Sequence, residues 1–229
     1  MEEINKKLYV RKIFDSISHR YDFLNHLLSA GIDFYWRKKA IRLSRMTLQT
    51  KLLDIACGTG DFSIIAKKIG VEKIFGADLS LNMLSIFNKK AGWIKGKLVE
   101  SVAEYLPFKD GTFTNIIVGF GVRNFYDITQ AFRSFHRILS AKGKVTILEF
   151  RLPTNSLVKK IYLFYFSKIL PLIGKLISKD KEAYTYLPES VDEFDRKIDL
   201  VKIFYDCKFS KVEKHSLTFG LVQVVIADK

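Results

Sequence analysis

The sequence predicts an α/β protein with a mostly parallel sheet that an antiparallel pair of strands closes at the C-terminal end. Short apolar runs alternate with helix-like stretches between residues 51 and 150. Two further strand-like runs follow near the C-terminus, and no repeat or Pro/Gly/Ser-rich linker interrupts the chain. A length of 229 residues suits one domain of this class. We therefore expect residues 1–229 to form a single domain.

The N-terminal part is expected to be helical. Apolar side chains recur near helical spacing over residues 7–45. Gly31 separates a helix over Tyr21–Ser29 from a basic helix over Phe34–Met46. We expect residues 1–46 to form helices that cover the functional site.

The central part contains the parallel strands. The predicted strands are Lys51–Ala56, Lys73–Ala77, Gly96–Ser101, Phe113–Gly119 and Lys144–Phe150. The helices between them are Gly60–Ile69, one that begins at Ser80 as N-cap, and Ile128–Leu139; a turn at Lys142 and Gly143 precedes the fifth strand. Strands separated by helices favour parallel pairing with right-handed crossovers.

The C-terminal part differs in pattern. Lys211–Leu217 and Leu221–Ala227 predict an antiparallel hairpin joined near Gly220, and residues 153–199 form a helical insertion before it. Ile161–Ile177 is strongly apolar, but it is short for a membrane span and contains two lysines, a proline and a glycine. Two interpretations stay open: a buried helix pair over the site, or an interfacial segment with Phe164, Phe166 and Leu170 against lipid. We favour contact with lipid or with a lipid tail.

Charge and composition restrict the partners. The chain has 38 Lys and Arg against 24 Asp and Glu, a net charge of +14, which suits nucleic acid, an anionic membrane or an acidic substrate. An aromatic content of 14% favours the membrane or an apolar ligand. Cys57 and Cys207 provide neither a disulfide framework nor a metal cluster, and the N-terminus is not a secretory signal. We expect a cytoplasmic protein without a metal.

The most informative motif is the glycine turn after the first strand. Gly58 and Gly60 allow a ligand to approach the backbone closely, and the N–H groups of the next helix face that ligand. An ordinary strand–helix turn is the simplest alternative. Ser63 stands where a dinucleotide fingerprint requires its third glycine, and no P-loop lysine follows. The remaining interpretation is the turn of an S-adenosylmethionine site.

Two carboxylates and one loop support this interpretation. Asp78 ends the second strand, where a carboxylate accepts both ribose hydroxyls, although it also suits the flank of the next helix. Asp54 is placed to order the glycine turn or to approach the methionyl ammonium. Residues 103–108 follow the third strand, where an adenine would lie.

Several motifs together resemble the quinone-biosynthesis C-methyltransferases. They are residues 54–61, 103–108, 119–124 and 148–150, with N-terminal motifs at 14–17 and 21–25 and a late motif at 184–190. The resemblance covers nearly the whole chain. It implies a class I S-adenosylmethionine-dependent methyltransferase of Rossmann-like fold, with seven strands and one antiparallel C-terminal strand. It further implies methylation of demethylmenaquinol, or of a polyprenyl benzoquinol as in ubiquinone biosynthesis.

The resemblance also implies which residues bind the co-substrate. They are Asp54, Gly58, Thr59, Gly60, Asp78, Val102, Ala103 and Gly119. The chain departs from the family pattern at Asp33, where His is usual, at residues 141–143, where Pro-Gly-Gly is usual, and at Arg151, where Ser is common. Gly119 replaces a serine, and Val102 replaces an asparagine, so we expect backbone contacts at these two positions.

The implied reaction moves the sulfonium methyl group to a carbon of the reduced ring, because only the quinol is electron-rich. Arg123 is the candidate to stabilise a quinolate and Asn124 to orient a hydroxyl or a water. Tyr21, Asp22 and His19 are candidate bases. The structural alternatives are a salt bridge from Arg123 to Asp127, a capping or charge-partner role for Asp22, and a solvated His19, which we favour for that residue. Tyr184 either contacts the head group or packs in the core.

Two other function classes fit parts of the sequence. The charge would suit a nucleic-acid methyltransferase, but the sequence has neither an Asn-Pro-Pro-aromatic run nor a Pro-Cys nucleophile. A membrane-docked binding module without turnover is the non-catalytic alternative. We expect a lipid-soluble polyprenyl quinol as partner and no nucleic acid. Transient contact with the inner face of a membrane is expected through Lys6–Lys12, Arg37–Arg45 and the insertion.

Overall fold

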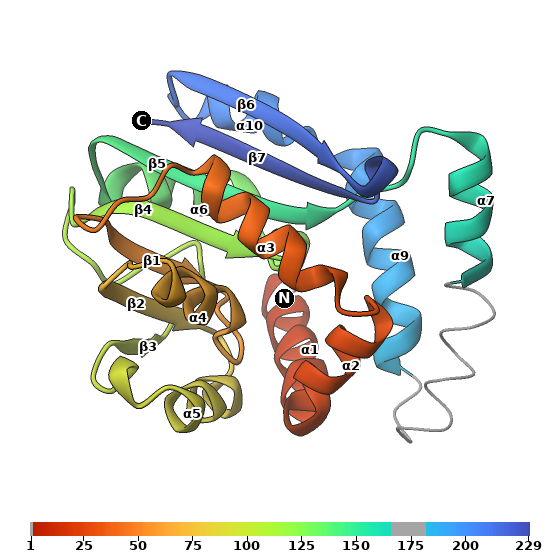
Figure 1. Ribbon diagram of the computed structural model, residues 1–229, viewed down its shortest axis with the longest axis horizontal. Coiled ribbons are helices and arrows are strands. Elements are labelled where there is room, and N and C mark those ends of the chain that lie inside the picture. Colours follow the sequence, from red (N-terminus) through yellow and green to blue (C-terminus); the bar gives the residue numbers. More distant parts are fainter. Residues whose placement is uncertain (1, 166–181) are drawn as a thin grey trace.

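The computed structural model of the protein describes residues 2–165 and 182–229, and a seven-stranded sheet forms its centre (Figure 1). The strand order is β3-β2-β1-β4-β5-β7-β6. The strands are β1 (Lys51–Ile55), β2 (Lys73–Asp78), β3 (Leu98–Glu100), β4 (Phe113–Gly119), β5 (Leu139–Phe150), β6 (Lys211–Leu217) and β7 (Val222–Asp228). Strands β1 to β5 pair in parallel, whereas β7 is antiparallel to both β5 and β6. The predicted sheet and hairpin are therefore confirmed.

The beginning of β5 differs from the expectation. Helix α6 (Ile128–Ile138) runs directly into β5 at Leu139, and Lys142 adopts a positive φ of 63° within the strand. The register passes from Phe113 opposite Leu139 to Asn115 opposite Lys144. Residues 140–143 thus bulge out of the ladder, and the predicted turn before the strand is a bulge inside it.

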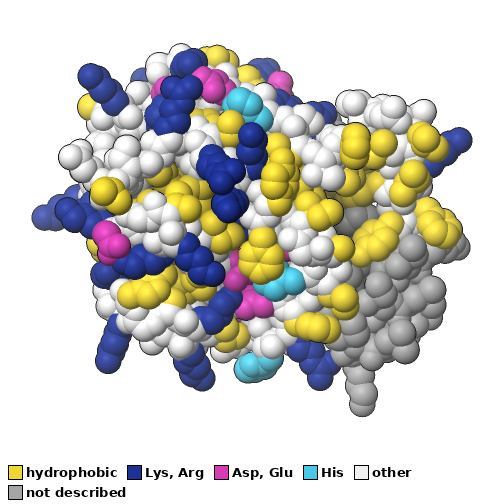
Figure 2. Space-filling view, in the orientation of Figure 1, with side chains coloured by type: hydrophobic (Ala, Val, Ile, Leu, Met, Phe, Trp, Pro, Cys, Tyr) yellow, Lys and Arg dark blue, Asp and Glu magenta, His cyan; other side chains and the backbone are white. Residues whose placement is uncertain are grey.

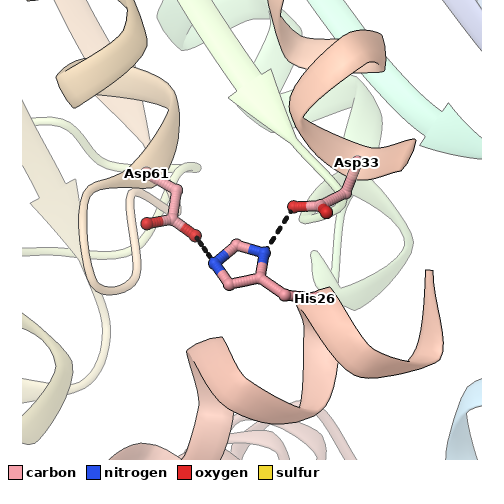
Figure 3. Close-up of side chains that lie close together, drawn as sticks. All are labelled: His26, Asp33 and Asp61. Carbon is pink, nitrogen blue, oxygen red and sulfur yellow. Dashed lines mark hydrogen bonds and ion pairs between the residues drawn. The ribbon is translucent and has the colours of Figure 1, made fainter. Parts of the chain in front are cut away.

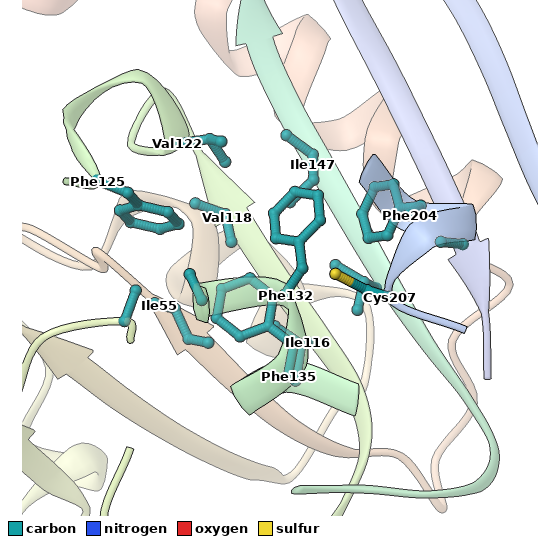
Figure 4. Packing of buried hydrophobic residues seen from close by; sticks show 14 of the residues in the cluster. Ile55, Ile116, Val118, Val122, Phe125, Phe132, Phe135, Ile147, Phe204 and Cys207 are labelled. Carbon is teal, nitrogen blue, oxygen red and sulfur yellow. The ribbon is translucent and has the colours of Figure 1, made fainter. Parts of the chain in front are cut away.

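Helices cover both faces of the sheet. The remaining helices of the sheet layers are α3 (Ile32–Leu43), α4 (Asp61–Lys68), α5 (Leu81–Lys90), η2 (Gly92–Ile94) and α10 (Leu200–Asp206). On one face, Phe132 of α6 stacks on Phe204 of α10 at 4.2 Å between ring centroids (Figure 4). On the other face, Trp36, Phe62 and Phe87 pack from α3, α4 and α5. Burial on both faces explains why the parallel strands are apolar runs without alternation.

The N-terminal helices lie beyond the carboxyl end of β4 (Figure 1). They are α1 (Glu2–Ile17), η1 (Ser18–Arg20) and α2 (Tyr21–Leu28), and Gly31 precedes α3 with φ +75°. Trp36 Nε1 donates to Thr218 Oγ1 at 2.7 Å, in η5 (Thr218–Gly220) between the hairpin strands. Helix α3 is therefore fastened to the hairpin, while α1 and α2 extend toward the strand ends.

The insertion between β5 and α10 contains α7 (Ser156–Phe164) and α9 (Glu182–Lys197), and α9 lies next to α1 (Figure 1). Val191 and Phe194 of α9 are buried. The part of the apolar segment from residue 166 onward, with Phe166 and Leu170, lies outside the described residues. None of the helices in the described ranges combines the length and the apolar character needed to cross a bilayer.

Candidate functional site

A cavity opens at the carboxyl ends of β1, β2 and β4, where the direction of the strand order reverses between β1 and β4. Ligands of open α/β sheets bind at such a switch point. The residues predicted from the sequence that line this cavity are Tyr21, Gly58, Asp78, Val102, Ala103, Gly119 and Asn124. The predicted residues that do not line it are Asp22, Asp54, Thr59, Gly60 and Arg123. The fold thus brings most of the predicted co-substrate-binding residues to the cavity wall, and the other predicted residues lie outside that wall.

The glycine turn consists of two glycines with different requirements. Both adopt left-handed backbone, with φ +52° at Gly58 and +88° at Gly60. A Cβ on Gly60 would lie 2.1 Å from Cδ2 of Phe87, so this glycine is required by packing against α5. A Cβ on Gly58 would meet only Tyr21 Cε1, at 3.8 Å, toward the cavity. Gly58 therefore leaves room for a ligand, and Gly60 leaves room for the core.

Asp78 joins the glycine turn to the next helix. Its Oδ2 accepts the Gly58 N–H and its Oδ1 accepts the Ser80 N–H, both at 2.8 Å. Burial raises the pKa of Asp78, and the backbone hydrogen bonds from Ser80 and Gly58 oppose that shift. A carboxylate has about four acceptor positions, and these backbone groups use two of them. Because Asp78 lines the cavity, the others are available to a bound ligand. Ser80 is the N-cap of α5, as predicted, and accepts the Met83 N–H.

Asp54 lies within β1 and is 1% exposed. Its Oδ2 accepts the backbone N–H of Ser63 at 3.1 Å and the Ser63 hydroxyl at 2.7 Å. Its Oδ1 is buried with no hydrogen-bond partner among the residues that the structure describes. Burial raises the pKa of Asp54 to about 7. Asp54 thus holds the first turn of α4 in place through hydrogen bonds from Ser63. In the sequence, Ser63 stood out only because a dinucleotide fingerprint has a glycine at that position.

Thr59 and Asp22 contact each other. The Thr59 hydroxyl donates to Asp22 Oδ1, and Asp22 Oδ2 accepts from Lys90 Nζ at 2.7 Å. Thr59 is 2% exposed, so its side chain is directed to α2 and not to the cavity. Asp22 therefore acts as a charge partner between helices. Nothing in the sequence around Lys90 indicated this contact.

Arg123 forms a buried ion pair, but not with Asp127. Its NH1 donates to Glu149 Oε1 at 2.6 Å and to the Phe120 carbonyl at 2.7 Å, and Glu149 is fully buried. The salt bridge to Asp127, given above as the structural alternative for Arg123, is not formed; Asp127 is the N-cap of α6 and accepts the Gln130 N–H. Arg123 lies in η3 (Val122–Asn124), next to the cavity-lining Asn124.

The wall of the cavity is largely aromatic. Phe14, Phe120, Phe125 and Tyr126 line it together with Tyr21. Burial raises the pKa of Tyr21, which keeps its phenol protonated near neutral pH and makes it a hydrogen-bond donor before a base.

Three other residues considered in the sequence are Glu104, His19 and Tyr184. Glu104 is 2% exposed and accepts the backbone N–H groups of Tyr126 and Asp127, so it supports the wall of the cavity. His19 is exposed, in agreement with the solvated interpretation. The side chain of Tyr184 lies outside the part of the chain that the structure describes.

The fold and the cavity define the class of this protein: a class I methyltransferase, which uses S-adenosylmethionine as methyl donor. The sequence model of the ubiE/COQ5 methyltransferase family matches residues 1–229, and the chain belongs to this family. The resemblance drawn from the motifs is thereby confirmed.

Curated relatives agree over nearly the whole chain. A demethylmenaquinone methyltransferase of Chlorobaculum tepidum is 42% identical over 224 residues, covering 96% of this chain and 92% of the relative. A ubiquinone/menaquinone biosynthesis C-methyltransferase UbiE of Geotalea uraniireducens is 39% identical over 226 residues, covering 96% of each.

Solved structures share the fold at low identity. A possible histamine N-methyltransferase of Thermotoga maritima aligns with a TM-score of 0.67 at 17% identity, over 95% of this chain and 99% of that chain. A putative S-adenosylmethionine-dependent methyltransferase of Methanococcus maripaludis gives 0.66 at 19% identity, over 94% and 93%. The predicted fold class is confirmed.

Proposed function

We propose that this methyltransferase transfers the methyl group of S-adenosylmethionine to a ring carbon of demethylmenaquinol and releases menaquinol. The observation that carries the proposal is the family match over residues 1–229, since it includes the cavity and both flanking helical parts. Relatives from Chlorobaculum tepidum and Thermus thermophilus, 42% and 38% identical, are named demethylmenaquinone methyltransferases. Their names favour a naphthoquinol over a benzoquinol.

The donor fits the cavity with its ribose at Asp78. Two acceptor positions of that carboxylate suit the two ribose hydroxyls, and Val102 and Ala103 line the side where the adenine would lie. Gly58 and Gly119 allow close backbone contact. Asp54 supports the donor through α4, and a nearby ammonium would favour its ionised form. In this assignment Thr59 and Gly60 shape the turn and do not contact the donor with their side chains.

The acceptor reacts as a quinolate. A ring carbon attacks the sulfonium methyl group, the carbon–sulfur bond breaks, and S-adenosylhomocysteine leaves as a neutral thioether. The ring then loses the proton of the methylated carbon and becomes aromatic again. Because an anion and a sulfonium cation combine, the transition state is less charged than the reactants, and an aromatic-walled cavity suits it.

Roles for the candidate catalytic residues follow from their positions. Asn124 lines the cavity and is assigned to orient the quinol hydroxyl, and Tyr21 is assigned as a hydrogen-bond donor to it. Arg123 is assigned as a positioning residue, since its guanidinium pairs with the buried Glu149 and does not line the cavity. Asp22 is assigned to hold α2 on the glycine turn, because both of its oxygens already accept hydrogen bonds.

Peripheral contact with an anionic membrane is part of the proposal, because the substrate is lipid-soluble. Leu157, Ile161 and Phe164 follow helical spacing on α7 and are 66%, 62% and 60% exposed. Lys159 and Lys160 on the same helix are exposed as well. Hydrophobic side chains gather over α7 and toward α3, and Lys and Arg side chains lie over α3 (Figure 2). This combination suits the boundary between head groups and acyl chains.

The test is methyl transfer from labelled S-adenosylmethionine under reducing conditions. A short-tailed demethylnaphthoquinol, the matching benzoquinol and bulk RNA are offered separately, and the products are separated by chromatography. We expect label in the naphthoquinol, and none when the ring is kept oxidised. Label only in the benzoquinol would move the substrate to ubiquinone biosynthesis, and label only in RNA would refute the proposal.

A further inference from the structure

Two side chains of α2, Asp22 and His26, contact the glycine turn and the start of α4. They lie one helical turn apart. Asp22 accepts from Thr59 of the glycine turn and from Lys90 of α5. Lys90 Nζ also donates to Asp61 Oδ1 at 2.6 Å, on the first residue of α4. Burial lowers the pKa of Lys90, but its hydrogen bonds to the two carboxylates outweigh that effect and raise the pKa. Lys90 therefore stays charged and bridges α2 and α4.

His26 forms the second link (Figure 3). Its Nδ1 lies 2.9 Å from Asp33 Oδ2, and its Nε2 lies 3.5 Å from Asp61 Oδ2. The imidazole ring therefore lies between a carboxylate of α3 and a carboxylate of α4. Its ring also stacks on Phe34 with 4.3 Å between ring centroids.

The charged groups around His26 come from four helices. The groups that face it or its partners come from each neighbouring helix: Asp22 from α2, Asp33 and Arg37 from α3, Asp61 from α4 and Lys90 from α5. Three carboxylates and two cations therefore meet around the His26 ring. His26, Asp33 and Asp61 are close enough to one another to hold a metal ion. Because Arg37 and Lys90 already pair with the two carboxylates, we interpret the cluster as a polar link between α2, α3 and α4.

The links matter because α2 also carries a wall of the cavity. Tyr21 lines the cavity and lies opposite Gly58. None of the α2 side chains that the structure describes is buried, and Phe23 and Leu27 are 57% and 43% exposed. Among the described side chains of α2, Asp22 and His26 provide polar contacts to the glycine turn and to α4.

We propose that His26 and Lys90 are positioning residues for the methyl donor. They fasten α2 to the first turn of α4 and so keep Tyr21 against the donor. The inference rests on the donor position given under the proposed function. It predicts that loss of either link weakens donor binding more than it slows the chemical step.

The test compares matched variants. His26→Gln and Lys90→Met remove the links, and His19→Gln and Lys89→Met make the same changes at exposed positions in η1 and on α5. Donor affinity is measured by calorimetry with S-adenosylhomocysteine, and KM and kcat are measured with the quinol. We expect the donor Kd and KM to rise about three- to tenfold in the first pair, since charge-assisted bonds are lost, with kcat within about twofold. Lys90→Arg should restore most of the affinity.

Equal donor affinity in the link variants and their controls would overturn the inference. Absence of donor binding in the wild type would instead refute the donor position. Thermal unfolding of every variant checks that it is folded.

Discussion

At the scale of single residues, the burial of Asp54 makes the free energy of unfolding depend on pH. Its pKa is about 7 in the folded protein against an ordinary 3.8, so the folded chain keeps a proton that the unfolded chain has lost. The free energy of unfolding must therefore fall as the pH rises through this interval. Between about pH 5.5 and about pH 8 we expect a loss of about 2 kcal/mol that Asp54→Asn does not show. Denaturant unfolding of both proteins without ligand checks this, and parallel pH profiles would contradict it.

The two glycines of the turn allow a matched pair of substitutions. Gly60→Ala places a methyl group into the Phe87 ring at a positive φ, and we expect a loss of about 2–4 kcal/mol in stability. Gly58→Ala has open space, so it should cost only about 1–2 kcal/mol, but its methyl group lies toward the cavity. Donor binding should weaken about tenfold or more in Gly58→Ala. Thermal unfolding and calorimetry measure the two effects, and equal losses of stability would contradict the assignment.

The sequence predicts a residue's local role when the groups that interact are close together in the chain. Ser80 caps the helix that it precedes, and Asp78 ends its strand, because both positions follow from a few neighbouring residues. The contact between Thr59 and Asp22 joins residues 37 positions apart. Many hydroxyls and carboxylates in the sequence would satisfy that chemistry equally well, so the pair could not be chosen before folding.

At the scale of elements, the ion pair between Arg123 and Glu149 connects η3 with β5, and Arg123 Nε reaches Ser190 Oγ of α9 at 3.3 Å. Arg123→Met leaves a fully buried carboxylate without this counter-charge, and we expect a loss of about 3–5 kcal/mol. The double variant Arg123→Met/Glu149→Leu should recover a large part of it, because both charges are then removed. Unfolding in urea measures both, and a double variant as unstable as the single one would contradict this account.

The start of β5 could not be predicted from local composition alone. Ala141, Lys142 and Gly143 have turn-like composition, and a turn was expected there. The chain instead bulges while it pairs with β4, since Phe113 and Leu139 are both buried and anchor the ladder before the bulge. Tertiary burial of a residue on each side decided where the strand begins.

At the scale of the whole molecule, membrane contact is a testable consequence of charge and exposed apolar surface. Leu157→Ser/Ile161→Ser should weaken partitioning onto anionic vesicles about tenfold, because two apolar side chains leave the interface. Leu48→Ser is the control, since Leu48 is 73% exposed and comes just before β1 in the chain. Strand β1 and helix α7 lie on opposite sides of the molecule (Figure 1). Vesicle flotation at low and high salt measures the effect, and binding should fall as salt screens the lysines. Equal flotation of the double variant and the control would exclude α7 as the contact.

The sequence by itself determined the order of strands and helices, the glycine turn, Asp78 at its strand end and the family. These features depend on periodicity, on backbone conformation and on residues close together in the chain. Only the tertiary structure decided that Glu149 and not Asp127 pairs with Arg123, that Thr59 turns to Asp22, and that His26 lies between two carboxylates. The reason is that a charged or hydroxyl group has many chemically suitable partners along the chain. The packing of helices against the sheet brings one of these suitable partners within hydrogen-bond distance.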